Sequence, residues 1–426
     1  MHLKDELQQR GFLYQSTSDD LFDIYDKWHE TLYFWCDPTA QSLHLGNFVV
    51  FMNAVNFMKR HNKLILIVWG ATWMIGDPGG KDAERTFLDE QTLTKNVDAI
   101  KSQVGWILKN LSTLSGTDFQ FEVINNNDFY TDMSFLGFLR EVGKYITVNQ
   151  MMAKETVKKR IEDPDKSISY TEFSYMLLQG YDFVRLYQDK NCKLQISWSD
   201  QWGNIVTWVE LIKKKLEGDA YGMTSPLVLD SSGKKFGKSE GNALRLNATM
   251  TTPFKVYQYF MNVSDEDVSR FLKLFTLLPL EDIDNIVQKH GENPSERYGQ
   301  SQLARYVTET IHGKVAMETA VKVTEFLFGE GDKVDTLKSL SSNEIEAIWH
   351  EVGALKIDGE LSVIDALVDS GLEASRGDAK KSIGAGAIYL QEEKISDIGA
   401  IIDKNIAIHG CLLLRKGKKN FKLLIA

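Results

Sequence analysis

One uninterrupted apolar run constrains the fold of this chain more than any other feature. Residues 64–68 (LILIV) contain no polar side chain, which is typical of a parallel strand buried on both faces of its sheet. Residues 31–36, 121–124 and 194–196 are further strand patterns, and helical patterns such as residues 48–60 separate the strands. This alternation predicts an α/β fold with a doubly wound parallel sheet, whose ligands bind beyond the carboxyl ends of the strands.

The pattern changes to helices from Pro253 onward. The polar residues 329–332 (GEGD) are a predicted linker. Beyond residue 361 we expect two short helices, followed by strands over residues 387–390 and 411–414. The α/β part is therefore followed by a helical part and by a small part of mixed structure.

Composition sets broad limits on the class of protein. At 426 residues, 43% hydrophobic and 25% charged, the chain is long enough for two or three domains and has an ordinary globular composition. No apolar run is long enough to cross a bilayer, and residues 1–6 do not resemble a signal peptide, so we expect a cytoplasmic protein. Cys36, Cys192 and Cys411 have no paired spacing, which fits a reducing compartment and predicts no metal site.

The net charge of −10 argues against a general polyanion binder, so a nucleic-acid partner would need local basic surface. The last residues supply basic side chains without an acid among them: Arg415, Lys416, Lys418, Lys419 and Lys422. Two interpretations remain open, an RNA contact or a solvated strand edge that lysines protect from pairing.

Polar motifs follow the predicted strands. Residues 37–40 (DPTA) lead into residues 44–47 (HLGN), which begin a helix, and residues 199–204 (SDQWGN) follow a later strand. Residues 235–239 (KFGKS) lie among glycines, which predicts a mobile loop. A helix start presents free N–H groups and the positive end of its dipole, and both favour phosphate.

A fourth motif places polar groups on one helix face. Tyr175, Gln179 and Asp182 are spaced i, i+4 and i+7, so they share one side of a helix. Beside an apolar opposite side, this spacing indicates residues that line a pocket. The alternative is a helix face exposed to water.

Together these motifs resemble the signatures of tyrosyl-tRNA synthetases of the bacterial and organellar type, which are class I enzymes. Residues 44–47 resemble the HIGH motif, residues 235–239 the KMSKS loop, and residues 175–183 the tyrosine-binding helix. The resemblance covers nearly the whole chain. It implies four parts: a Rossmann-like catalytic domain over residues 1–225, a KMSKS-like loop and linker over 226–253, an α-helical domain on the anticodon side over 254–330, and a small α+β domain similar to ribosomal protein S4, which binds RNA, over 331–426.

The resemblance implies a tyrosine–tRNA ligase. Such an enzyme activates L-tyrosine with ATP, releases pyrophosphate and transfers tyrosine to the terminal ribose of tRNA(Tyr). The substrate carboxylate is the nucleophile, so the protein need only supply alignment and positive charge. Mg²⁺ is expected with ATP as part of the substrate complex, without a tightly bound protein metal. The family works as a homodimer, and no membrane partner is expected.

The resemblance also assigns the site residues. Those expected to act on the phosphates in catalysis are His44, Asn47, Lys81, Arg85, Lys235, Lys238 and Ser239. The ATP-binding set is Asp37, Thr39, His44, Gly46, Trp198, Asp200 and Lys238. The tyrosine-binding set, in which Asp182 and Tyr33 take the phenol hydroxyl, is Tyr33, Asp77, Asn126, Tyr175, Gln179, Asp182 and Gln201.

Simpler interpretations stand beside two of these assignments. His44 could be an ordinary helix-capping histidine, and residues 235–239 could be a solvated basic turn. Asn47 replaces the second histidine of the HIGH motif. It can donate a hydrogen bond but cannot carry a charge, which predicts one weakened phosphate contact.

The chain departs from the family in its tryptophans. The family usually has glycine at the places of Trp35, Trp69, Trp73, Trp198 and Trp208, and Trp28 is a candidate sixth position. Glycine lets the backbone approach a ligand, whereas an indole fills that space. One hypothesis explains all five positions: the gene uses UGA for glycine, and the translation reads it as tryptophan. Trp202, which the family shares, should then be encoded by UGG.

Three functions therefore remain open. The first is the tyrosine–tRNA ligase, which the joint presence of Tyr33, Asp182, His44 and Lys238 favours. The second is a non-catalytic RNA-binding paralogue whose nucleotide site is closed by tryptophans. The third is a ligase for another amino acid in a reshaped pocket.

Overall fold

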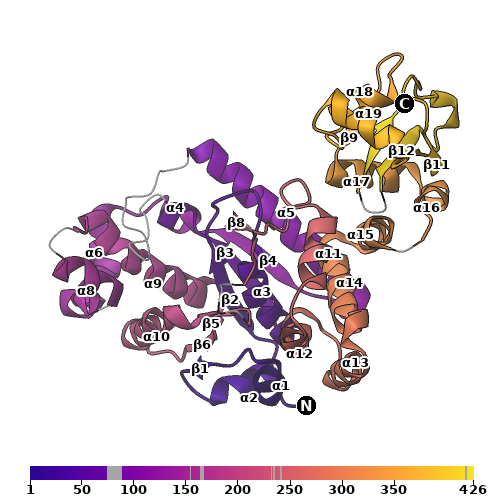
Figure 1. Ribbon diagram of the computed structural model, residues 1–426. Coiled ribbons are helices and arrows are strands. Elements are labelled where there is room, and N and C mark those ends of the chain that lie inside the picture. The colour runs from indigo at the N-terminus through magenta and orange to yellow at the C-terminus, as the bar shows by residue number, and fades with distance from the viewer. Residues whose placement is uncertain are drawn as a thin grey trace. The chain divides into compact units, whose positions relative to one another are not determined.

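The structure is a computed structural model that describes residues 1–73, 89–153, 155–163, 167–231, 233, 236–239, 242–329, 331–417 and 420–426. The chain forms two compact units, Met1–Gly313 and Lys314–Ala426 (Figure 1). The finer division into four parts stays a prediction. No helix of the described residues is long and apolar enough to cross a membrane.

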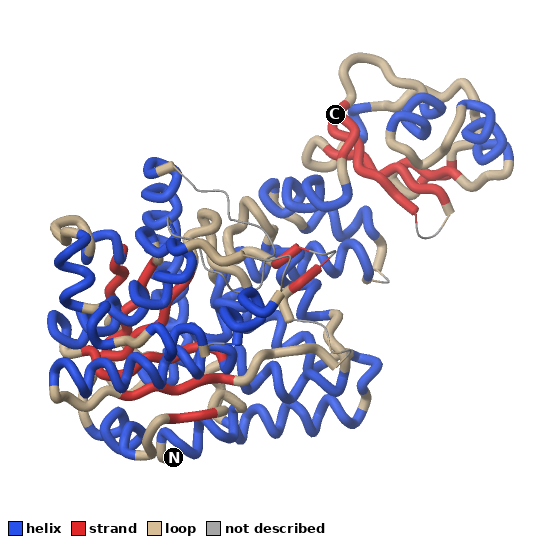
Figure 2. Tube along the Cα trace, turned by 90° about the vertical axis from the view of Figure 1, so that its left-hand side faces the viewer, coloured by secondary structure: helices blue, strands red, loops and turns tan. Residues whose placement is uncertain are grey.

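The first unit is built on a six-stranded sheet in the order β1-β6-β5-β2-β3-β4 (Figure 2). All neighbouring strands are parallel except β1 and β6. This confirms the doubly wound parallel sheet. The strands are β1 (Gln15–Ser16), β2 (Thr31–Cys36), β3 (Lys63–Val68), β4 (Phe121–Asn125), β5 (Cys192–Trp198) and β6 (Tyr221–Ser225). The sequence patterns missed β1, which is only two residues long, and β6, which contains a glycine and so has a weak strand signal.

Helices cover both faces of this sheet. Phe34 of β2 contacts Phe51 of α3 (Leu45–Met58) on one face. Its neighbour Tyr33 contacts Phe183 of α9 (Tyr170–Lys190) on the other, because successive strand residues point to opposite faces. The residues expected to bind tyrosine therefore belong to the α9 face. The other helices up to residue 216 are α1 (Leu3–Arg10), α2 (Asp20–Lys27), α4 (Gly70–Trp73), α5 (Glu90–Ser115), α6 (Phe135–Glu141), α7 (Val148–Met152), α8 (Glu155–Glu162) and α10 (Trp202–Leu216).

A short hairpin and a group of helices complete the first unit. The hairpin pairs β7 (Lys238–Ser239) with β8 (Asn242–Ala243). The helices confirm the helical pattern expected after Pro253, and they are α11 (Pro253–Met261), α12 (Asp265–Phe275), α13 (Leu280–Glu292) and α14 (Tyr298–His312).

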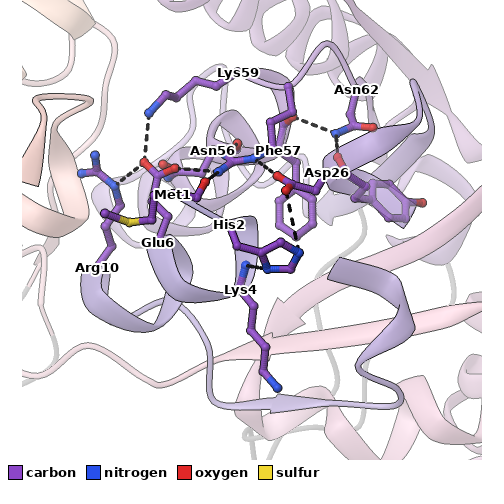
Figure 3. Close-up of polar contacts among 12 residues, drawn as sticks. Met1, His2, Lys4, Glu6, Arg10, Asp26, Asn56, Phe57, Lys59 and Asn62 are labelled. Atoms are coloured by element: carbon purple, nitrogen blue, oxygen red, sulfur yellow. Dashed lines mark hydrogen bonds and ion pairs between the residues drawn. The ribbon is translucent and has the colours of Figure 1, made fainter. Parts of the chain in front are cut away.

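A buried ion-pair cluster joins the N-terminal helix to α3 (Figure 3). The Glu6 carboxylate lies 3.0 Å from Arg10, 2.9 Å from Lys59 and 3.0 Å from Arg60. Burial would raise the pKa of Glu6, but hydrogen bonds and charge interactions with Lys59 and Arg10 lower it to about 2. Arg10 also donates to the carbonyl oxygen of Thr276 at 3.1 Å. The cluster therefore links α1 to α3 and to the end of α12.

The second unit contains a five-stranded sheet in the order β11-β10-β12-β13-β9. Its apolar side is covered by α18 and α19, whose buried side chains share one core with β10, β12 and β13. The elements are α15 (Lys314–Phe328), α16 (Lys333–Ser339), α17 (Ser342–Val352), β9 (Ala354–Lys356), α18 (Val363–Asp369), α19 (Arg376–Gly384), β10 (Ile388–Leu390), β11 (Glu393–Lys394), β12 (Cys411–Lys416) and β13 (Asn420–Ile425). The expected small α+β domain is confirmed, and β9 is an additional strand.

The basic residues near the C-terminus are only partly available to a partner. Arg415 pairs with Glu392, and Lys416 lies 2.8 Å from Glu373. Over Leu423–Ile425, β13 has β12 on one side and β9 on the other. This part of β13 is therefore not a free strand edge that lysines could protect from pairing. Lys418 and Lys419 lie outside the described residues.

Candidate active site

His44 begins α3 and is held there by a reciprocal cap. Its Nδ1 accepts from the backbone N–H of Asn47 at 3.1 Å, and its own N–H donates to Asn47 Oδ1 at 3.2 Å. Burial, with the charge of Arg245 adding to it, lowers the pKa of His44 to about 4. The ring is therefore neutral at pH 7, and because Nδ1 accepts, its proton lies on Nε2. The capping interpretation is correct, and it leaves an Nε2–H donor suited to a phosphate oxygen.

The segment after residue 236 pairs directly with the start of α3. Leu45 N–H donates to Leu244 O at 3.0 Å, and Leu246 N–H donates to Leu43 O at 2.9 Å. Gly237 has a φ of +78°, and a Cβ built on it would lie 2.9 Å from Leu45 Cβ. Two motifs far apart in the sequence thus meet at one helix N-terminus, where backbone N–H groups attract anions.

Several of the expected phosphate residues, and one expected tyrosine residue, fall outside what the structure describes. Lys235 and residues 74–88, which include Asp77, Lys81 and Arg85, are outside the described residues. Lys238 and Ser239 are placed by their backbone as β7, and their side chains are not described. The roles of these residues stay predictions.

Arg245 is a cation at this site that the sequence motifs did not identify. Its Nη1 donates to Ser42 O at 2.9 Å, and its Nη2 lies 3.5 Å from Thr39 Oγ1. Burial lowers the pKa of Arg245 from its usual value, but a guanidinium remains charged at neutral pH. Only its position after the glycine-rich loop could have drawn attention to it, because its partners are about two hundred residues away.

The remaining residues that are expected to bind ATP lie along the same end of the sheet. Asp37 follows β2 and is half-buried, and Thr39 is exposed beside Arg245. Gly46 lies in the first turn of α3, where a Cβ would come within 2.9 Å of the His44 ring. Trp198 ends β5, and Asp200 is exposed in the 3-10 turn that follows. The carboxyl ends of β2 and β5 therefore meet here, as a doubly wound sheet requires.

The polar face of α9 is buried. Tyr175, Gln179 and Asp182 are only 6%, 1% and 1% exposed, so the interpretation as a solvated face is wrong. Gln179 Nε2 lies 3.4 Å from Gln201 Oε1. Asn204, which was not assigned a role, donates to Gln179 at 3.2 Å and to Gln201 at 3.0 Å. Asn204 therefore orients two residues of the predicted tyrosine site.

Asp182 is the buried carboxylate at the centre of this face. It accepts from Asn126 Nδ2 at 3.0 Å and from Tyr130 OH at 2.7 Å. The indole of Trp69 also acts to lower the pKa of Asp182. Burial raises the pKa of Asp182 to about 7, although these hydrogen bonds act to lower it. Tyr130 was missed in the sequence because no motif spacing connects it to α9.

Two tryptophans lie among the residues expected to bind tyrosine. Trp35 and Trp69 are stacked with their ring centroids 3.6 Å apart. Trp69 also meets the Tyr175 ring edge-on at 5.7 Å. Trp208 is fully buried against α9, where a Cβ on Gly180 would lie 2.5 Å from its ring. The side chain of Trp73 is not described.

The arrangement suits two kinds of ligand group. An anion such as phosphate is favoured at the start of α3. The helix dipole and the Arg245 cation supply positive charge there, and His44 supplies an N–H donor. The α9 face offers a buried carboxylate, a hydroxyl and amides that could bind a polar aromatic group. Among the described residues, no group of three or more His, Cys, Asp or Glu side chains could hold a metal ion.

Comparisons with known proteins give the family. The family model described as tRNA synthetases class I (W and Y) matches residues 28–329, and that described as the tyrosine–tRNA ligase SYY-like C-terminal domain matches residues 344–424. Tyrosine–tRNA ligases of Streptococcus agalactiae and Streptococcus gordonii are 41% and 40% identical over 428 residues, and each match covers 100% of this chain and 99% and 100% of theirs. A C-terminally truncated mitochondrial tyrosyl-tRNA synthetase of Aspergillus nidulans has a TM-score of 0.70 at 28% identity, over 77% of this chain and 94% of that one. With its parallel sheet and its joined motifs, the chain therefore belongs to the class I tRNA synthetases, in the tyrosine–tRNA ligase family.

Proposed function

We propose that this chain is an ATP-dependent tyrosine–tRNA ligase. It joins the carboxylate of L-tyrosine to the α-phosphate of ATP, releases pyrophosphate and then transfers tyrosine to the terminal ribose of tRNA(Tyr). The observation that carries the proposal is the backbone pairing of residues 43–45 with residues 244–246. This pairing brings the start of α3 and the segment that carries Lys238 to one anion-binding position.

The protein's part in activation is to position the reactants and to stabilise charge. The Nε2–H of neutral His44 and the cation of Arg245 stabilise the negative charge that develops on the phosphates. The family resemblance assigns the same role to Lys235 and Lys238, whose side chains lie outside what the structure describes. The negative charge of bound ATP would be shared with Mg²⁺, which enters with the nucleotide and supplies further charge neutralisation. Such contacts act mainly in the transition state, so they raise the rate more than the affinity.

Asp182 and Tyr33 select the substrate by its hydroxyl group. A buried site built to hydrogen-bond a hydroxyl rejects an analogue without it, because the site's polar groups are then left unpaired. Gln179, Gln201 and Asn204 form a connected amide group beside it, which suits the amino and carboxyl groups of an amino acid.

A homodimer is part of the proposal. Large apolar side chains are exposed on α6, α7 and α8, and Figure 1 places α6 and α8 beside α9. They include Phe135 at 64%, Leu136 at 76% and Val148 at 57% exposure. An apolar group of this kind marks an interaction surface, and a second copy would bury it. Light scattering on the purified protein tests this, and a monomer at micromolar concentration would contradict it.

Residues 314–426 are proposed to contact tRNA, and the role in translation places the protein in the cytoplasm. The sharpest test of the whole proposal is tyrosine-dependent exchange of labelled pyrophosphate into ATP, measured on the chain as written and on the chain with Trp35 and Trp69 both replaced by glycine. Exchange with tyrosine and not with phenylalanine or tryptophan supports the ligase. Exchange with another amino acid alone would contradict it.

A second candidate is a non-catalytic RNA-binding paralogue. The stacked Trp35 and Trp69 favour it, because they lie where the amino acid would bind. This candidate predicts binding of tRNA without pyrophosphate exchange, both in the chain as written and after these indoles are removed.

A further inference from the structure

We propose that Trp35 and Trp69 fill the amino-acid subsite, so that tyrosine binds only to a form of the chain that has small residues at these two positions. This inference rests on the proposed function. It identifies two residues that decide whether the site is open.

Trp69 makes the contacts that a bound tyrosine would make. Its indole lies near enough to lower the pKa of Asp182, the carboxylate expected to accept from the phenol hydroxyl. Its ring meets the Tyr175 ring at 5.7 Å and 88°, although Tyr175 is expected to border the substrate. An indole N–H donor therefore stands in the place of a phenol O–H donor.

Trp35 closes the site from the neighbouring strand. Trp35 and Tyr33 are two residues apart on β2, so both point to the α9 face. The Trp35 ring covers Trp69 at 3.6 Å with an angle of 13° between the planes. The two stacked indoles occupy the subsite together, and removal of either alone would leave the other in the subsite.

Polar atoms beside these indoles lack partners among the described residues. They are Tyr33 OH, Trp35 Nε1 and both amide atoms of Gln195. Gln195 is fully buried and pairs with Tyr33 across β5 and β2. Buried polar groups are nearly always hydrogen-bonded. By contrast, Trp349 in the second unit donates its indole N–H to Cys411 Sγ. The site has the polar groups of a ligand pocket, and the indoles leave them unused.

The tryptophans are also gathered in one place. Trp35, Trp69 and Trp198 lie at the carboxyl ends of β2, β3 and β5, which is the edge where a doubly wound sheet binds its ligands. Independent replacements would not be expected to choose the largest side chain at that edge. The UGA hypothesis offers a single cause, since reading UGA as glycine would remove these indoles together.

The test compares three proteins by isothermal titration with L-tyrosine: the chain as written, Trp35→Gly/Trp69→Gly, and the control Trp28→Gly. Trp28 is 64% exposed, so its variant removes an indole away from the subsite. We expect the double variant to bind tyrosine at least about 100-fold more tightly than the other two proteins. Equal tyrosine binding by the chain as written would overturn the inference.

Folding is checked by the thermal midpoint of each protein with and without tyrosine, because a ligand that binds the native state raises it. A tyrosine-dependent rise in the double variant alone supports the inference. Trp35→Ala/Trp69→Ala serves as a second open form. If neither open form folds, the indoles are required core residues and the inference is wrong. If both fold and bind no amino acid, the indoles do not block a tyrosine subsite, and the inference is again wrong.

Pyrophosphate exchange separates this inference from the proposed function. If the double variant binds an amino acid but exchanges only with one other than tyrosine, the function fails and the filled subsite stands. If the chain as written exchanges with tyrosine, the function stands and the inference fails. Peptide masses of the protein from its natural source give an independent result: glycine at positions 35 and 69 supports the inference, and tryptophan at both in an active ligase overturns it.

Discussion

At the scale of single residues, we propose that Asp182 decides which amino acid is accepted. Its oxygens lie 2.7 Å from Tyr130 OH and 3.0 Å from Asn126 Nδ2, so its position is fixed before a substrate arrives. In the Trp35→Gly/Trp69→Gly chain, we expect Asp182→Asn to reduce the preference for tyrosine over phenylalanine by about 10- to 100-fold, the cost of leaving one buried hydrogen-bonding group unpaired. The ratio of the kcat/KM values for tyrosine and phenylalanine in pyrophosphate exchange measures this preference.

The control is Asp189→Asn, at an exposed position of the same helix. An equal loss of preference in the control would contradict the role of Asp182 in selecting tyrosine.

Glu6 is the residue whose charge links stability to pH. Its pKa is lowered from 4.5 to about 2 in the folded chain, so its ion pairs stabilise the fold above pH 5. This contribution, about 3 kcal/mol, is lost as the pH falls from 4.5 toward 2, because the unfolded chain then binds a proton at this carboxylate more readily than the folded chain does. Glu6→Gln should therefore lower the free energy of unfolding at pH 7, and the difference from the parent should shrink below pH 4. Urea unfolding at several pH values measures it, and a difference independent of pH would contradict the ion-pair account.

At the scale of elements, the contact between Gly237 and α3 joins the two motifs that are expected to bind phosphate. Gly237 and Gly233 both have positive φ, +78° and +80°, but only a Cβ at Gly237 would meet another residue, at 2.9 Å from Leu45 Cβ. Ala at either position carries the left-handed strain of about 1–2 kcal/mol, whereas Gly237→Ala must also displace the segment from α3. We expect Gly237→Ala to slow tyrosyl-adenylate formation about tenfold more than Gly233→Ala, with tyrosine affinity unchanged. Single-turnover kinetics on the Trp35→Gly/Trp69→Gly chain distinguish the two, and equal rates would show that the contact is not needed.

At the scale of the whole molecule, we expect the two compact units to carry different functions. The candidate tyrosine and phosphate residues all lie before Gly313, where the first unit ends. Removing residues 314–426 should therefore leave adenylate formation largely intact and reduce tRNA charging. The comparison again uses the Trp35→Gly/Trp69→Gly chain, with pyrophosphate exchange and aminoacylation measured side by side. Full charging by the shortened protein at physiological salt would contradict an RNA-binding role for the second unit.

The sequence by itself determined the sheet, the helix that carries Tyr175, Gln179 and Asp182, and the family, because apolar runs, helical spacing and local motifs are properties of neighbouring residues. Other features depended on residues far apart in the chain. The pairing of Arg245 with Ser42, the contact of Tyr130 with Asp182 and the stacking of Trp35 on Trp69 leave no local pattern. Likewise, β1 and β6 are weak strands alone and form because each pairs with a neighbour. Tertiary structure decided these contacts because only the folded sheet brings its strand ends together, and there Trp35 and Trp69 lie against Tyr175, one of the residues expected to bind tyrosine.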